Sequence, residues 1–82
     1  MQKFLEVRNN TAHGEDFPNS ICRELIDISK INHVYIELPE EKAICIEWIS
    51  RKGYHMDKVE EFDSKAACYT RFNEISRILC GD

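Results

Sequence analysis

Two carboxylates and two histidines in the middle of this chain are the side chains best suited to chemistry. Glu47 and Asp57 are expected to lie side by side on neighbouring strands, and paired carboxylates are one arrangement that supports general acid–base catalysis. His33 and His55 are the candidate metal ligands of the same region. Their strands should be two strand spacings apart, about 9–10 Å, whereas zinc requires ring nitrogens at about 2.0–2.1 Å. We therefore expect neither a metal site nor a bound cofactor, and we assign no catalytic residue.

The cysteines give no indication of metal binding or redox catalysis. Cys22, Cys45, Cys68 and Cys80 include no C-x-x-C pair, which a zinc ribbon or a thioredoxin-like motif would require. Four cysteines in 82 residues is about 5%, below the ~8–10% typical of disulfide scaffolds. We expect free thiols, with Cys68 in the core. The segment His13–Asp16 holds three possible ligands but lacks EF-hand spacing, so we interpret it as a polar loop.

Composition and charge describe one small domain. The 82 residues are 43% hydrophobic and 32% charged, and 15 acidic and 11 basic side chains give a net charge of −4. We expect a single domain over residues 1–82, since typical domains reach about 100–150 residues. No apolar run approaches the ~18–20 residues of a membrane span, and the first residues lack the apolar region of a signal peptide. We therefore expect a cytoplasmic protein without membrane contact.

The same sequence features argue against two broad functions. An acidic chain lacks the usual electrostatic attraction to phosphate, which disfavours nucleic acid as a partner. The common phosphate-binding and nucleophile motifs are absent, and the chain has only three glycines. We therefore predict that the protein is not an enzyme.

Alternating and β-branched segments predict five strands that would position the candidate side chains. Their expected ranges are residues 3–8, 21–28, 31–38, 43–49 and 54–59. A connection of turn-forming residues, Asn9–Ser20, separates the first two. A tight turn or a single helical turn is expected near Asp27–Ile31. Arg51–Gly53 fits a three-residue hairpin loop in which Gly53 takes the left-handed conformation.

The end of the chain has helical periodicity. Spacings of 4, 3 and 4 residues predict one apolar stripe, formed by Cys68, Phe72, Ile75 and Leu79. Asp63 or Ser64 can cap the start of this helix, and Gly81 suits the position after its end. The sequence therefore predicts an α+β fold. It consists of a small antiparallel β-sheet of about five strands with one C-terminal amphipathic helix packed on one face.

Hydrophobic pairing predicts the strand registers. The expected pairs are Val34 with Trp48, Ile36 with Ile46, and Leu38 with Ile44. A one-residue slip would bury Glu47. The hairpin loop then sets Trp48 opposite Met56. The rows expected on the other face are Tyr35 with Glu47 and Asp57, and His33 with Ile49 and His55. Because Glu47 and Asp57 repel each other, we expect either a different register or a nearby cation.

The uncovered sheet face is predicted to be the interaction surface, because one helix covers only one face of a small sheet. Its residues are Tyr35, Glu37, Glu47, Ile49, His55 and Asp57. Our leading hypothesis is a non-enzymatic protein–protein interaction or regulatory module of phage or mobile-element origin. Such a module would self-associate as a homodimer or bind a protein partner through this face.

Two alternatives stay open. A nucleic-acid-binding module would use Arg51 and Lys52 at the hairpin tip and Arg71 on the helix. A small metal-binding or hydrolytic protein would use the histidines and the carboxylates, and this alternative ranks last.

Three segments in the middle of the chain together form one pattern of hydrophobic spacings. They are Leu25–Val34, Ala43–Ile46 leading to Gly53, and Val59–Phe62 before the helix. In this pattern the chain resembles, over about residues 24–64, the small bacterial and phage proteins typified by the flagellar protein FlbD. It departs from them in its connection at Asn9–Ser20, its four cysteines and its longer terminal helix. The resemblance implies a compact sheet-plus-helix protein and supplies no catalytic residues.

Overall fold

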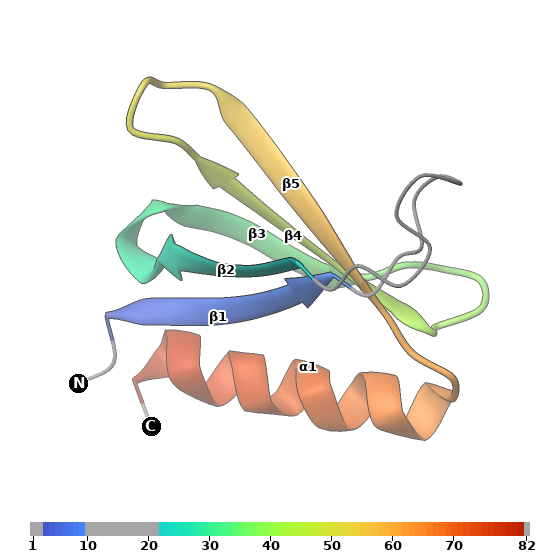
Figure 1. The fold of residues 1–82 in the computed structure, drawn as a ribbon. Helices are drawn as coiled ribbons and strands as arrows, with labels where there is room; N and C mark the ends of the chain where they lie inside the picture. The colour runs from blue at the N-terminus through green and yellow to red at the C-terminus, as the bar shows by residue number, and fades with distance from the viewer. Residues whose placement is uncertain (1–2, 10–21, 82) are drawn as a thin grey trace.

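The computed structural model of the chain describes residues 3–9 and 22–81 and has the predicted α+β class (Figure 1). Its elements are β1 (Phe4–Asn9), β2 (Cys22–Asp27), the 3-10 turn η1 (Ile28–Lys30), β3 (Ile31–Ile36), β4 (Ala43–Ile49), β5 (His55–Glu61) and α1 (Lys65–Cys80). The predicted connection after β1 and the His13–Asp16 segment within it lie outside the described residues.

The five strands form two antiparallel sheets, so the prediction of one sheet is wrong. One sheet is the β1–β2 hairpin, and the other has the strand order β3-β4-β5. The division falls at η1. The Asp27 carboxylate accepts hydrogen bonds from the backbone N–H (2.9 Å) and the hydroxyl (2.7 Å) of Ser29 and caps this turn. This local bonding favours a turn at the point where the chain passes from one sheet to the other.

The register of β4 with β5 is the predicted one. Trp48 pairs with Met56 and Ile46 with Lys58. The Ser50 N–H donates to the Tyr54 carbonyl at 2.9 Å, and Gly53 has a φ of 85°. Both features are those expected of the short hairpin loop, because a positive φ is readily adopted only by glycine.

The register of β3 with β4 differs from the prediction by two residues. Val34 pairs with Ile46 and Ile36 with Ile44, and the register shifts between Ile31 and His33. The reason lies at the far end of β3. The strand ends at Ile36, with one further backbone bond from Glu37 to Ala43, and Leu38 belongs to the turn, where it is 77% exposed. A shift of two residues keeps each side chain on its expected face but changes its neighbours.

The core draws on both sheets and on the helix. It consists of Leu5, Val7, Ile26, Ile44, Ile46, Trp48, Cys68 and Ile75. We call the face of the β3–β4–β5 sheet that carries Ile44, Ile46 and Trp48 the inner face. Helix α1 lies below the strands in the view of Figure 1, contacts β3 and β4, and contributes the predicted apolar stripe, with Cys68 and Ile75 fully buried. The Ser64 hydroxyl accepts from the Ala67 N–H at 3.1 Å, and Gly81 follows the helix with a φ of 82°.

An ion pair joins the helix to the inner face of the sheet. The Glu60 side chain is 6% exposed, and its two carboxylate oxygens accept from Nε (2.9 Å) and Nη2 (3.0 Å) of Arg71. Nη2 also donates to the Glu6 backbone carbonyl at 2.7 Å, and Nη1 binds Glu74. Arg71 therefore connects α1 with β1 and β5 at once, and its charge is satisfied within the fold.

Candidate interaction surface

The outer face of the β3–β4–β5 sheet is the face opposite the core. By strand alternation its residues are His33, Tyr35, Cys45, Glu47, Ile49, His55, Asp57 and Val59. None of these belongs to the core cluster, and the polar members are exposed or partly exposed. Apart from the buried Cys45, the face therefore carries side chains that are exposed or partly exposed in the described structure.

The neighbours on this face differ from the predicted rows because of the two-residue shift in β3. His33, Glu47 and Asp57 form one row, and Tyr35 pairs with Cys45. The predicted contacts of Tyr35 with Glu47 and of His33 with Ile49 across the ladder are therefore wrong. The remaining predicted pairs, Glu47 with Asp57 and Ile49 with His55, are confirmed.

The nearest side chain that could carry positive charge beside the paired carboxylates is His33. Its Nδ1 lies 3.8 Å from Oε1 of Glu47, with side chains 61% and 40% exposed. The pair is attractive only while the histidine is protonated, and solvent screens it at this exposure. Glu47 and Asp57 are directly opposite each other, which destabilises a sheet by a few tenths of a kcal/mol. With two carboxylates and one histidine, the row therefore has a net negative charge whether His33 is protonated or neutral.

Tyr35 and Cys45 form the second feature of the outer face. A hydrogen bond with the Cys45 thiol, together with the nearby Glu47, raises the pKa of Tyr35 to about 12. The rings of His33 and Tyr35 lie with centroids 4.7 Å apart at an angle of 37°. Cys45 is only 4% exposed, and burial raises the pKa of its thiol. A buried thiol that stays protonated is a poor nucleophile, so this pair is better suited to packing than to catalysis.

The other predicted site residues are not brought together. Glu37 lies just beyond β3 and is exposed beside the turn. Arg51 and Lys52 are exposed at the β4–β5 hairpin tip, whereas Arg71 contacts Glu60 near the opposite end of β5. The three basic residues of the nucleic-acid alternative therefore do not form one surface.

Sequence reasoning missed one feature near Glu37. A groove of about 480 Å³ follows the β3–β4 turn and is lined by Glu37, Leu38, Pro39, Glu40, Glu61 and Phe62, among others. Glu41 in the same turn has a φ of 59°, and its carboxylate binds Lys65 Nζ (2.8 Å) and the Tyr69 hydroxyl of α1. The sequence signal for this turn is Leu38-Pro39, because a residue before proline is restricted to extended or turn conformations.

Comparison with known proteins adds no relative to this picture: no family model, curated protein or solved structure matches the chain. The resemblance to FlbD-type proteins therefore stays a prediction. In the described part of the chain, no helix has the length and apolar character of a membrane span, and no three side chains are grouped as metal ligands would be.

Proposed function

We propose that this protein is a non-enzymatic interaction module that binds a basic surface of a partner protein through its outer face. The observation that carries the proposal is the adjacent pair of a partly exposed Glu47 and an exposed Asp57 on the sheet face opposite the core cluster. Half-buried Tyr35, Ile49 and Val59 lie among these charges and offer apolar contact area. Mixed apolar and charged surface of this kind is typical of recognition sites.

The charge of the face decides which kind of partner it fits. Two copies meeting through this face would bring Glu47 and Asp57 of one copy against the same acidic residues of the other. Like charges across an interface are unfavourable, whereas a lysine- or arginine-bearing partner would be attracted and steered to the face. A basic partner therefore accounts for the retained repulsion between Glu47 and Asp57.

The two buried thiols support an interaction role over a catalytic one. Cys45 and Cys68 are free and buried. Burial raises the pKa values of Cys45 and Cys68, which makes both thiols unreactive. This proposal assigns no catalytic residue.

The test compares two charge-reversal variants of equal net charge. Glu47→Lys combined with Asp57→Lys reverses the outer face. Glu40→Lys combined with Asp63→Lys makes the same change at exposed positions off that face. Affinity capture from the source cells should recover a basic protein with the wild type and the control but not with the outer-face variant. Equal recovery by both variants, or no basic protein among the partners, would contradict the proposal.

A further inference from the structure

Among the described strands, β3 lies at an edge of its sheet and has one backbone edge without a strand neighbour. It pairs only with β4 in the described structure, and the Glu37 N–H donates to the Ala43 carbonyl at 2.9 Å. Because bonded pairs alternate along an antiparallel ladder, the backbone groups of Tyr35 face β4 while those of Val34 and Ile36 point away from it. Within the described residues, no backbone hydrogen bond from another element reaches Val34 or Ile36. These groups are therefore placed to pair with an additional strand.

The composition of this edge is unusual for a monomer. Ile31–Ile36 contains no lysine, arginine, aspartate, glutamate or proline, although the chain is 32% charged. Monomeric proteins usually protect an edge strand with charges, proline or a bulge. The only such device here is the register shift between Ile31 and His33, at the start of the strand. The rest of β3 is a good template for strand pairing.

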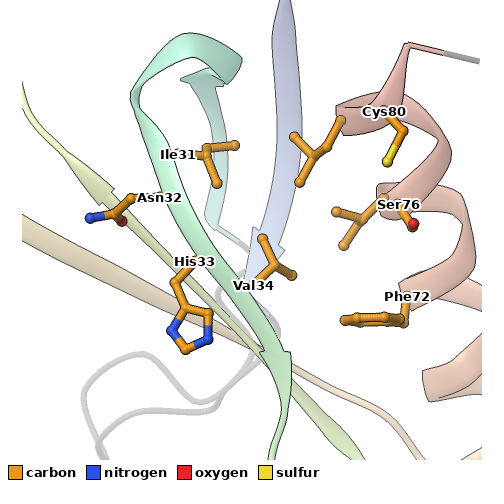
Figure 2. A pocket seen from close by; sticks show the side chains of 9 residues that line it. Ile31, Asn32, His33, Val34, Phe72, Ser76 and Cys80 are labelled. Carbon is orange, nitrogen blue, oxygen red and sulfur yellow. The ribbon is translucent and has the colours of Figure 1, made fainter.

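A neutral groove lies beside the open edge. It has a volume of about 260 Å³ between β3 and the second half of α1. In Figure 2, Ile31 and Val34 point from β3 toward the helix, and the Phe72 ring extends from α1 toward β3. Phe72, Ser76 and Cys80 line the helix side at spacings of four and so lie on one side of α1. We call these three residues the helix stripe, to distinguish them from the apolar stripe that faces the core. No lysine, arginine, aspartate or glutamate lines this groove.

We propose that β3 pairs antiparallel with β3 of a second copy of this chain, about a two-fold axis at Val34. The axis sets Val34 opposite its own equivalent and Asn32 opposite Ile36, so the outward backbone groups meet each other. His33 of one copy then lies beside Tyr35 of the other on the outer face. The result is a continuous six-stranded sheet in which the helix stripes of the two copies approach each other.

Self-compatibility is the reason for choosing a second copy as the occupant. A two-fold interface brings each patch against itself, so a patch without formal charges is acceptable where an acidic one is not. The β3 edge and the helix stripe meet this condition, whereas the outer face does not. This interface is separate from the proposed partner site, and it places the outer faces of both copies on the same side of the joined sheet.

The test is the association state measured by sedimentation equilibrium. The wild type should be a dimer. Ser76→Arg should dissociate it by adding bulk and charge to the stripe, and Thr70→Arg should not, since Thr70 is exposed on α1 but does not line the groove. In the dimer, the amides of Val34 and Ile36 should exchange more slowly with solvent than in Ser76→Arg.

Three results would overturn the proposal. The first is a wild type that remains monomeric up to about 1 mM, a concentration at which even weak association is populated. The second is a dimer that persists in Ser76→Arg. The third is a dimer in which the amides of Val34 and Ile36 exchange fast with solvent. An extended peptide that protects the same amides of a monomeric wild type would identify a different occupant. The variant carrying Glu47→Lys and Asp57→Lys should remain a dimer, so failure of the partner site and failure of this interface are distinguishable.

Discussion

Both faces of the β3–β4–β5 sheet carry charged side chains, but the two faces differ in how far these charges are buried and paired within the fold. On the inner face, Glu60 is almost fully buried and is bound through both oxygens by Arg71. On the outer face, Glu47 stands directly opposite Asp57, and His33 is 3.8 Å from one of them. Charge on the inner face is therefore committed to the fold, whereas charge on the outer face is available to a partner.

The largest expected effect is the loss of the inner ion pair. Arg71→Met removes both hydrogen bonds that Arg71 donates to the buried Glu60 carboxylate, and removing one partner of a buried pair costs about 3–5 kcal/mol. Urea unfolding should show this decrease in the free energy of unfolding. Arg77→Met, at an exposed position in the last turn, is the control and should cost less than about 1 kcal/mol. Equal effects of the two substitutions would show that Arg71 is not a structural residue.

A smaller effect should appear at alkaline pH on the outer face. The pKa of Tyr35 is about 12 in the folded protein, above the ordinary value of 10.0. Between these values the unfolded chain loses this proton first, so folding stability should fall as the pH rises from about 10 to about 12. Tyr35→Phe should weaken this pH dependence. Part of it should remain, because hydrogen bonds with Glu41 also raise the pKa values of Tyr69 and Lys65.

The measurement for this prediction is urea unfolding across the alkaline range. Tyr54→Phe, at an exposed position of the hairpin tip, is the matched control. Its free energy of unfolding should fall with pH as steeply as that of the wild type. A wild-type slope in Tyr35→Phe would mean that the Tyr35–Cys45 hydrogen bond does not hold the phenol proton.

The smallest expected effect is a gain. Asp57→Asn removes the repulsion with Glu47 and should raise the free energy of unfolding by about 0.2–0.5 kcal/mol. The same substitution should weaken binding of the basic partner. Glu40→Gln, at an exposed position in the β3–β4 turn, lies off the ladder and should leave both quantities unchanged, as thermal unfolding and partner titration can establish. A loss of stability in Asp57→Asn would mean that the carboxylate has a structural role.

Local patterns predicted those parts of the fold that local interactions determine. The helix follows from the 3.6-residue period of its apolar residues together with Ser64 and Gly81 at its ends. The β4–β5 register follows from the short hairpin loop closed by Gly53. In both cases the residues that decide the structure are near each other in the sequence.

The β3–β4 register and the division into two sheets depend on more distant or weaker signals. Hydrophobic alternation cannot distinguish registers that differ by two residues, and only the end of β3 before Leu38-Pro39 selects one of them. The side-chain bonds of Asp27 identify a turn but not the sheet that the next strand joins.

The inner ion pair could have been found from the sequence. The confirmed β4–β5 register places Lys58 on the inner face, and the next inward position is Glu60. A buried carboxylate requires a cation, and the helix offers Arg71 beside its apolar stripe. The six residues proposed for the outer site follow from one strand-alternation pattern and its extension at Glu37, and their role in binding stays a prediction.

We propose above all that Glu47 and Asp57 of the outer face bind a basic partner. This proposal is tested most directly by the dissociation constant of the captured partner, measured by titration calorimetry at low and at physiological salt. We expect Glu47→Lys with Asp57→Lys to weaken binding at least about tenfold and to remove most of the salt dependence of the dissociation constant. We expect Glu40→Lys with Asp63→Lys to change neither quantity. Equal affinities and equal salt dependence for the two variants would contradict it.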